Sequence, residues 1–289
     1  GAYSRLPEDD ARSASPSGNI GSMVDIICAD TVTVLDASHA GQVLIGGSHG
    51  GIYAGYLAAK AGVRAVILHN AGVGKDQAGL GSLAYLAALG MPAAVLDHNS
   101  ARIADGRDQL ARGIVSHVNA RAEALGCRAG ESCRACAERM AAAEQWHGTA
   151  PEFGESRFLL RAGDGGPEVW GVDSTSLLRA ADKGAVMITA SHGALFGSAK
   201  NRPIAGPPLA VIFNDAGVGR ENRGIARLPA LNQEGVIAAT VAAESARIGD
   251  ARSAWESGII SHANATAQSA GIAPGDNLQT FANKAIARG

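Results

Sequence analysis

Aromatic residues are scarce in this sequence, which also lacks a membrane-length apolar run and a strong excess of either charge. Aromatic side chains make up only 4% of its 289 residues, and the formal net charge is -2. Nucleic-acid-binding proteins usually carry a basic face, so this balance argues against a nucleic-acid partner. No apolar run approaches bilayer length, and no apolar stretch near the start predicts a secretory signal. We therefore expect a cytoplasmic protein whose partner is neither a nucleic acid nor a membrane.

Cysteine is scarce as well, with four in the chain. Cys127, Cys133 and Cys136 suggest a metal cluster at first sight, but with Met140 they also form an apolar stripe at helical spacing. An internal repeat, described below, places large apolar residues at the same three positions of the other half (Ile272, Leu278 and Phe281). Free cysteine packs as a small hydrophobe. We predict core packing, with no metal and no cofactor; a zinc site or a disulfide is the weaker alternative.

The remaining composition is globular, with 46% hydrophobic and 18% charged residues and 38 glycines. Alanine-rich helices packed on a glycine-punctuated sheet would give this balance. Residues 1–22 are polar, rich in Ser, Pro and Gly, and end in Gly-Ser just before Met23. We interpret them as an expression-vector remnant, and the alternative is a native disordered arm.

An internal repeat dominates the rest of the chain. Four blocks occur twice in the same order and at nearly one spacing: Ser48-His49-Gly50 with Ser191-His192-Gly193, Asn70–Asp76 with Asp215–Glu221, Ser100–Arg107 with Ser245–Arg252, and Gly113–Ala120 with Gly258–Ala265. Chance does not produce such a series, so we infer a gene duplication. The predicted halves are residues 23–145 and 146–289.

Each half reads as alternating strands and helices. Short apolar runs bounded by glycine and separated by helical patterns indicate parallel βαβ units. In the first half, residues 106–126 read as one long helix after the third strand. Residues 157–172 read as a hairpin with a Gly-Asp-Gly-Gly turn. We predict an α/β fold with mainly parallel sheets, in which two three-layer βαβαβα halves are related by a pseudo-twofold axis.

The shared blocks follow the predicted strands, where ligands bind in open parallel sheets. The catalytic candidates are two serines with their histidine neighbours (Ser48, His49, Ser191, His192) and two later histidines as better-placed bases (His117, His262). The binding candidates are the other shared loop residues: Asn70, Gly72, Gly74, Lys75, Asp76, Ser100 and Arg102, with Asp215, Gly217, Gly219, Arg220, Glu221, Ser245 and Arg247. Glycine has a steric explanation at tight turns. The competing interpretation of each arginine is a surface pair with a nearby acid.

The stretch Val43–Gly72 resembles the nucleophile region of the α/β-hydrolases, because Gly46-Gly47-Ser48-His49-Gly50 fits G-x-S-x-G before a helix. That resemblance would make Ser48 the nucleophile. It stops there, because too few strands precede this turn and because that fold is no tandem duplication. The second copy also lacks the first glycine, and Asp97, a candidate triad acid, pairs with Ala242. We retain a nucleophilic serine but not that fold.

The loop after the second strand resembles the end of a phosphate loop, but His69 and Asp76 replace the glycine and the Ser/Thr that the full pattern needs. Backbone amides and Lys75 or Arg220 could still bind an anion there. We therefore predict a hydrolase that cleaves a small polar or anionic amide or ester. Its site is expected at the C-terminal ends of the strands, and one possible location is between the two halves. The alternatives are an isomerase or lyase acting on a small carboxylate, and a non-catalytic small-ligand-binding protein. A homo-oligomer is a further expectation.

Overall fold

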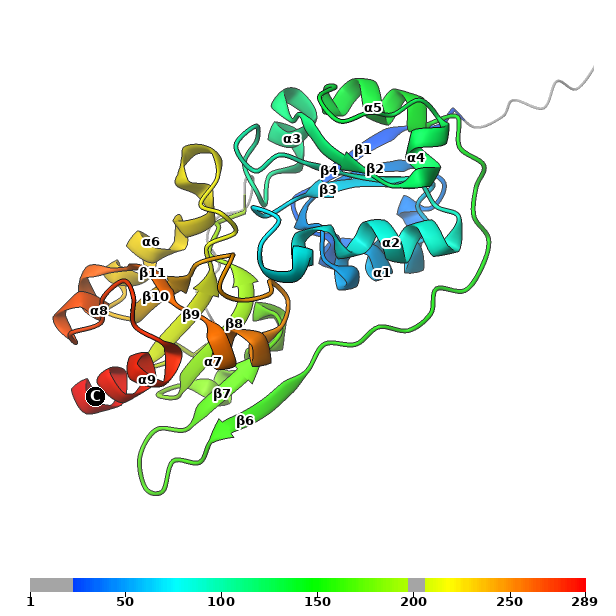
Figure 1. The fold of residues 1–289 in the computed structure, drawn as a ribbon. Coiled ribbons are helices and arrows are strands. Elements are labelled where there is room, and N and C mark those ends of the chain that lie inside the picture. Colours follow the sequence, from blue (N-terminus) through cyan, green and yellow to red (C-terminus); the bar gives the residue numbers. More distant parts are fainter. Residues whose placement is uncertain (1–22, 197–205) are drawn as a thin grey trace, which may run out of the picture.

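The computed structural model describes residues 23–196 and 206–289, so the predicted remnant over 1–22 lies outside the described residues. Two mixed sheets of five and six strands lie side by side (Figure 1). The first sheet has the order β1-β2-β3-β4-β5, and the second has the order β11-β10-β9-β8-β7-β6. This confirms the predicted α/β fold of two repeated, mainly parallel halves.

The strands of the first sheet are Ile26–Ala29 (β1), Val43–His49 (β2), Ala65–His69 (β3), Ala93–Leu96 (β4) and Val115–Val118 (β5). Those of the second sheet are Arg157–Arg161 (β6), Val169–Val172 (β7), Val186–His192 (β8), Ala210–Asn214 (β9), Ile237–Val241 (β10) and Ile260–Ala263 (β11). Strands β1 to β4 are parallel, as are β7 to β10. The edge strands β5, β6 and β11 run antiparallel to their neighbours.

Helices cover both faces of each sheet (Figure 1). In the first half they are Ile52–Lys60 (α1) and Gly81–Leu89 (α2) on one face, and Gly106–Arg112 (α3), Ala120–Ala124 (α4) and Cys133–Met140 (α5) on the other. In the second half they are Arg227–Gln233 (α6) on one face, and Ala251–Ser257 (α7), Ala265–Ser269 (α8) and Leu278–Arg288 (α9) on the other. Among the described residues, no helix is long and apolar enough to cross a bilayer.

Strand β2 shows why the parallel strands are apolar without alternation. Val43 and Ile45 face the cluster formed with α3, α4 and α5, whereas Leu44 between them faces α1 and α2. All three side chains are fully buried. Successive side chains point to opposite faces of a strand, so a sheet covered on both faces needs apolar residues at every position.

The single long helix predicted over residues 106–126 is wrong. The structure places α3, β5 and α4 there, and α7, β11 and α8 at the equivalent positions. Gly113 ends α3 in an extended conformation, and a Cβ on it would lie 2.5 Å from the carbonyl oxygen of Gln109. The next residues pair with β4. Tertiary pairing overrides a helical pattern here because β-branched residues follow a helix-ending glycine.

The two halves differ at one face. The described residues between β8 and β9 contain no helix, although α1 fills the equivalent place of the first half. The second sheet also has β6, which pairs antiparallel with β7 across the Gly-Asp-Gly-Gly turn. Among the described residues, the halves therefore differ at the place of α1 and by the additional strand β6.

The halves meet at a junction formed mainly by two equivalent loops, which follow β3 and β9. On the pseudo-twofold axis, a Cβ added to Gly72 would lie 2.8 Å from the Cα of Gly217, and one on Gly217 would lie 2.8 Å from the Cα of Gly72. Away from the axis, the amide of Lys75 donates to the carbonyl of Ala243 (2.9 Å). The amide of Arg220 donates to the carbonyl of His98 (2.8 Å) in the same way.

Both loops adopt an unusual backbone. Each has four non-glycine residues with positive φ: Ala71, Val73, Asp76 and Gln77 in the first, and Ala216, Val218, Glu221 and Asn222 in the second. This left-handed conformation costs roughly 1–2 kcal/mol per ordinary residue and is an outlier for a β-branched valine. Such strain persists only where the surroundings impose it. Here hydrogen bonds within the same half supply part of those surroundings, and the Gly72–Gly217 approach and the Lys75–Ala243 bond supply the part that comes from the opposite half.

Replacing Gly72 by alanine tests the axis contact. We expect Gly72→Ala to lower the free energy of unfolding by at least about 2 kcal/mol more than Gly90→Ala, because both add a Cβ at positive φ but only the first meets backbone. Gly90 has a φ of +84° and nothing within 4 Å of an added Cβ, so it measures the conformational cost alone. Urea denaturation of both variants gives the difference. Equal losses would show that the axis contact is not tight.

Candidate functional site

The two predicted nucleophiles, Ser48 and Ser191, each accept a hydrogen bond from a backbone amide. The Oγ of Ser48 accepts from the amide of Val32 at 3.0 Å, and the Oγ of Ser191 accepts from the amide of Thr175 at 2.9 Å. Within the described part of the chain, neither hydroxyl has a histidine nitrogen within hydrogen-bonding distance. A nucleophilic serine needs an adjacent base. This geometry instead makes each serine a clamp between its strand and the segment that follows β1 or β7.

The histidines next to these serines are held as neutral donors. The Nδ1 of His49 accepts from the amide of Gly51 (3.1 Å), and the Nδ1 of His192 accepts from the amide of Ala194 (3.2 Å). This assigns the proton of each neutral ring to Nε2. Burial lowers the pKa of His49 to about 4. Burial and the charge of Arg227 hold the pKa of His192 well below its usual range. Both rings are neutral at pH 7, and because each Nδ1 lone pair already accepts a backbone amide, neither ring offers a free acceptor nitrogen for a substrate proton.

A third imidazole, His69 at the end of β3, has an entirely local role. Its Nδ1 accepts from the amide of Ala71, and its Nε2 donates to the carbonyl of Ala101, both at 3.1 Å. Asn214 makes the same two bonds in the second half, from the amide of Ala216 (2.9 Å) and to the carbonyl of Ala246 (3.1 Å). The side chain therefore connects two loops and does not need to be an imidazole.

The two candidate bases lie on the antiparallel edge strands. His117 is in β5, not in a helix, and its Nδ1 lies 3.0 Å from the Oγ of Ser116. His262 is in β11, with its Nδ1 3.2 Å from the Oγ of Ser261. In the first sheet β3 and β4 separate β5 from β2, and the second sheet has the same arrangement. The structure therefore does not bring these histidines to Ser48 or Ser191.

The loop amides that could have held an anion are already used. Those of residues 71–75, 77 and 79 all donate to protein acceptors, and the second loop repeats this pattern. The Oδ1 of Asn70 accepts from the amides of Gly72 and His98 (3.0 and 3.1 Å). The Oδ1 of Asp215 accepts from two equivalent amides, those of Gly217 and Ala243. These shared residues build the loops themselves.

The shared charged residues join the halves. Arg102 donates to Asp105 (2.7 Å) and across the junction to Glu221 (3.0 Å). Arg247 makes the equivalent contacts with Asp250 (2.9 Å) and, across the junction, with Asp76 (2.7 Å). The surface-pair interpretation thus accounts for both arginines, with the addition that one partner of each belongs to the other half.

The remaining six predicted binding residues also lie at the junction. The Nζ of Lys75 donates to the Oγ of Ser257 (2.7 Å), and Arg220 donates to the carbonyl of Ser100 (3.1 Å). The hydroxyls of Ser100 and Ser245 donate, each at 2.7 Å, to carbonyls three residues earlier. With Gly74 and Gly219 packed against the opposite backbone, every shared loop residue has a structural partner.

The cysteines pack as the repeat suggests. Cys127, Cys133 and Cys136 are fully buried in one apolar cluster, and all four cysteines of the chain are free thiols. The two outer thiols lie near a carboxylate of Glu131, with their ligand atoms within 4.8 Å of one another. Glu131 pairs with Arg139, however, as Asp276 pairs with Lys284 in the half that has no cysteines. That carboxylate is therefore part of the repeated fold.

Two arginines that the sequence analysis missed lie at the junction and, like Lys75, have no ion-paired acid among the described residues. Arg227 donates to the carbonyl of Ala194 (2.9 Å), and its guanidinium lies over the ring of Phe213. Burial lowers its pKa to about 10. The pKa of Arg223 is also lowered, by burial and by the charge of Arg102, and its buried Nε has no hydrogen-bond partner.

Neither arginine has a carboxylate within ion-pair distance among the described residues. The repeat places Ala78 and Ser82 at their positions in the first half. A comparison of the halves for charge, not for identity, would have found them.

Comparison with known proteins adds no relative: no family model matches the chain, and no curated protein or solved structure is significantly similar to it.

The pH dependence of stability tests the buried His69. Its folded pKa of about 4 lies below the ordinary 6.5, so only the unfolded chain gains a proton between these values. Stability therefore falls as pH drops from 6.5 towards 4, by up to about 3 kcal/mol from this residue, and is unaffected above 6.5. We expect His69→Asn, which copies Asn214, to fold and to remove that share of the acid loss. Urea denaturation at pH 7.5 and pH 5 measures it; an unchanged pH dependence contradicts the assignment.

A fluorophosphonate probe tests the nucleophilic serines. With no base in contact, we expect no stoichiometric adduct on Ser48 or Ser191 in the folded protein, as read by mass spectrometry. An adduct on either serine that disappears when the protein is unfolded beforehand would reinstate the predicted nucleophile.

Proposed function

We propose that the second half binds a small anionic molecule, a carboxylate or a phosphate, at the C-terminal ends of β8 and β9. The observation that carries this proposal is the pair Arg223 and Arg227, two partly buried cations with no carboxylate in ion-pair contact among the described residues; Asp30, Asp105 and Asp108 act on Arg223 only from farther away. A buried charge without a counter-ion is costly, and a bound anion would offset that cost. Guanidinium groups suit carboxylate and phosphate oxygens.

The surroundings of the arginines support an anion. His192 lies close enough to both for their charges to lower its pKa, and its tautomer makes Nε2 a donor. Arg223, Arg227 and the Nε2 of His192 are thus three hydrogen-bond donors near the end of one strand. The first half has Ala78 and Ser82 at the two arginine positions. We therefore infer one anion site per chain, in the diverged half.

Catalysis stays a prediction. Hydrolysis of an amide or ester would need a base beside Ser48 or Ser191, and an isomerase or lyase would need a base near the bound carboxylate. The three junction imidazoles have pKa values far below neutrality, with Nδ1 occupied. Among the functions that the sequence predicts, binding of a small ligand needs no group beyond those described.

Glutamine substitutions test the arginine pair. Arg227→Gln and Arg223→Gln remove the charge and keep a shorter polar side chain; the first also loses the bond from Nη2 to the carbonyl of Ala194. We expect titration calorimetry with sodium phosphate and with sodium succinate, at constant ionic strength, to show binding by the wild type. Either substitution should weaken it at least tenfold, since a hydrogen bond to a charged group contributes about 1.5–3 kcal/mol.

Stability gives an independent check of the same variants. In anion-free buffer Arg227→Gln should unfold no more easily than the wild type, because it removes an uncompensated charge; with phosphate the wild type should be the more stable. Arg121→Ala, which removes an exposed arginine of α4, is the control and should leave binding unchanged. No anion binding by the wild type, or equal binding by all variants, would refute the proposal.

A further inference from the structure

His49, at the end of β2 in the first half, reaches the strand end near which the second half carries Arg223 and Arg227. A Cβ added to Gly249 would lie 3.5 Å from the Cε1 and 4.0 Å from the Nε2 of His49. The amide of Gly249 donates to the carbonyl of Ala190 in β8 (2.9 Å). The Nε2 edge of this imidazole therefore lies beside the C-terminal end of β8, across the junction from its own sheet.

His192, the equivalent of His49 in the repeat, stands at the end of β8 itself. Burial lowers its pKa, and the charges of Arg227, His49, His69 and Arg223 lower it further. Because interactions between charges weaken with distance, these side chains lie near the ring of His192. The junction thus brings one histidine of each half to the arginine pair.

The Nε2 atoms of His49 and His192 are donors that the protein leaves unused. Each Nδ1 accepts a backbone amide, from Gly51 in His49 and from Ala194 in His192, so Nε2 carries the proton of the neutral ring. Within the described part of the chain neither Nε2 donates to a protein acceptor, and neither atom is fully buried. Both are therefore accessible to a ligand.

This set of donors fits an anion with several oxygens. Arg223 and Arg227 carry two positive charges, and the neutral rings of His49 and His192 add two N–H donors without adding charge. A phosphate monoester carries a charge of about −1.5 to −2 at neutral pH and has three strong acceptor oxygens. A single carboxylate has one charge and two oxygens. The phosphate matches both the charge and the number of donors more closely.

We infer that the anion of the proposed site is a phosphate monoester, bound between the two halves with His49 of the first half as one of its donors. This inference rests on the proposed function, because it concerns the same site. The guanidinium groups of Arg223 and Arg227 bind phosphate oxygens, and the Nε2 atoms of His49 and His192 donate to them, one from each half. Neither half alone holds the complete set of donors.

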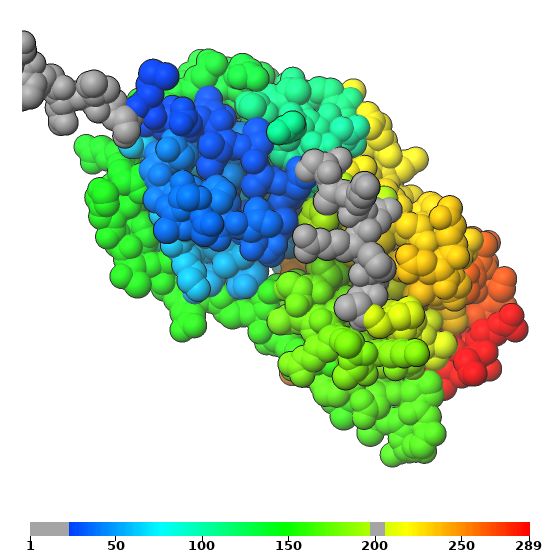
Figure 2. All heavy atoms as spheres, turned by 180° about the vertical axis from the view of Figure 1, so that it is seen from behind, coloured from blue at the N-terminus to red at the C-terminus, as the bar shows by residue number. Residues whose placement is uncertain are grey.

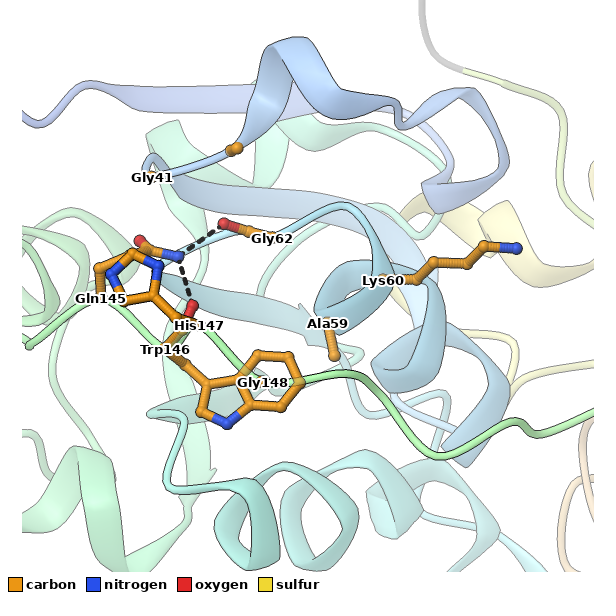
Figure 3. A pocket seen from close by; sticks show the side chains of 9 residues that line it. Gly41, Ala59, Lys60, Gly62, Gln145, Trp146, His147 and Gly148 are labelled. Atoms are coloured by element: carbon orange, nitrogen blue, oxygen red, sulfur yellow. Dashed lines mark hydrogen bonds between the residues drawn. The ribbon is translucent and has the colours of Figure 1, made fainter.

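The pocket at the opposite end of β2 and β3 does not offer such a set. It has a volume of about 430 Å³ and lies between the end of α1 and residues 145–148 (Figure 3). The Nε2 of Gln145 already donates to two backbone carbonyls, and the side chain of Lys60 points away from the other lining residues (Figure 3). His147, which is exposed at this pocket, therefore serves as a control histidine.

Titration calorimetry of the full chain with methyl phosphate and with sodium acetate, at constant ionic strength, tests the inference. We expect methyl phosphate to bind at least tenfold more tightly than acetate. His49→Leu, which removes the Nε2 donor, should weaken methyl phosphate binding at least fivefold. His49→Asn should restore part of the loss, because Asn214 makes the two hydrogen bonds that His69 makes in the other half. His147→Leu should change nothing.

Nuclear magnetic resonance of the wild type needs no substitution, so it decides the matter if His49→Leu fails to fold. The Nε2 signal of His49 should shift on addition of methyl phosphate, and that of His147 should not.

Two outcomes would overturn this inference and leave the proposed function standing. One is methyl phosphate binding that Arg227→Gln weakens but His49→Leu does not, with an unshifted His49 signal. The other is equal affinity for acetate and methyl phosphate. No binding of either anion by the wild type would refute the proposed function together with this inference.

Discussion

The close approach of Gly72 and Gly217 is the constraint on which the rest of the junction depends. Two backbones can meet at this distance only without side chains, and the flanking loop residues must then turn through left-handed conformations. From that contact the amides of Lys75 and Arg220 reach the opposite half, and the arginine–acid pairs lie further out. The sequence blocks shared by the two halves are therefore the segments that build this junction.

The symmetry gives the identity between the halves a structural explanation. Two copies that face each other across an axis keep the same residues in order to fit each other, and the same residues also stand at strand ends. The informative positions are those where the copies disagree. Arg223 and Arg227 of the second half, where the first half has Ala78 and Ser82, are such positions. In the view from behind, the two halves lie against each other, the first mostly blue to green and the second yellow-green to red (Figure 2).

Much of the fold could be predicted from the sequence, because glycine-bounded apolar runs and a repeat fix the number and type of its layers. The strand β5 could not, because its pairing with β4 is a long-range contact that a helical pattern conceals. The shared blocks lie at or after the C-terminal ends of β2, β3, β4 and the equivalent strands, as the sequence predicts. The roles of these residues could not be predicted from the sequence, because a serine such as Ser48 has the same sequence context whether it attacks a substrate or accepts a hydrogen bond from a backbone amide.

The mutual bracing of the loops has a consequence for how the molecule unfolds. A strained loop such as residues 71–77 loses part of what holds its conformation when the opposite half unfolds, and the same holds for residues 216–222. Neither half can lose its structure without releasing the other from its constraint. The chain should therefore behave as one cooperative unit, in which the duplication ties two sheets into a single folding event.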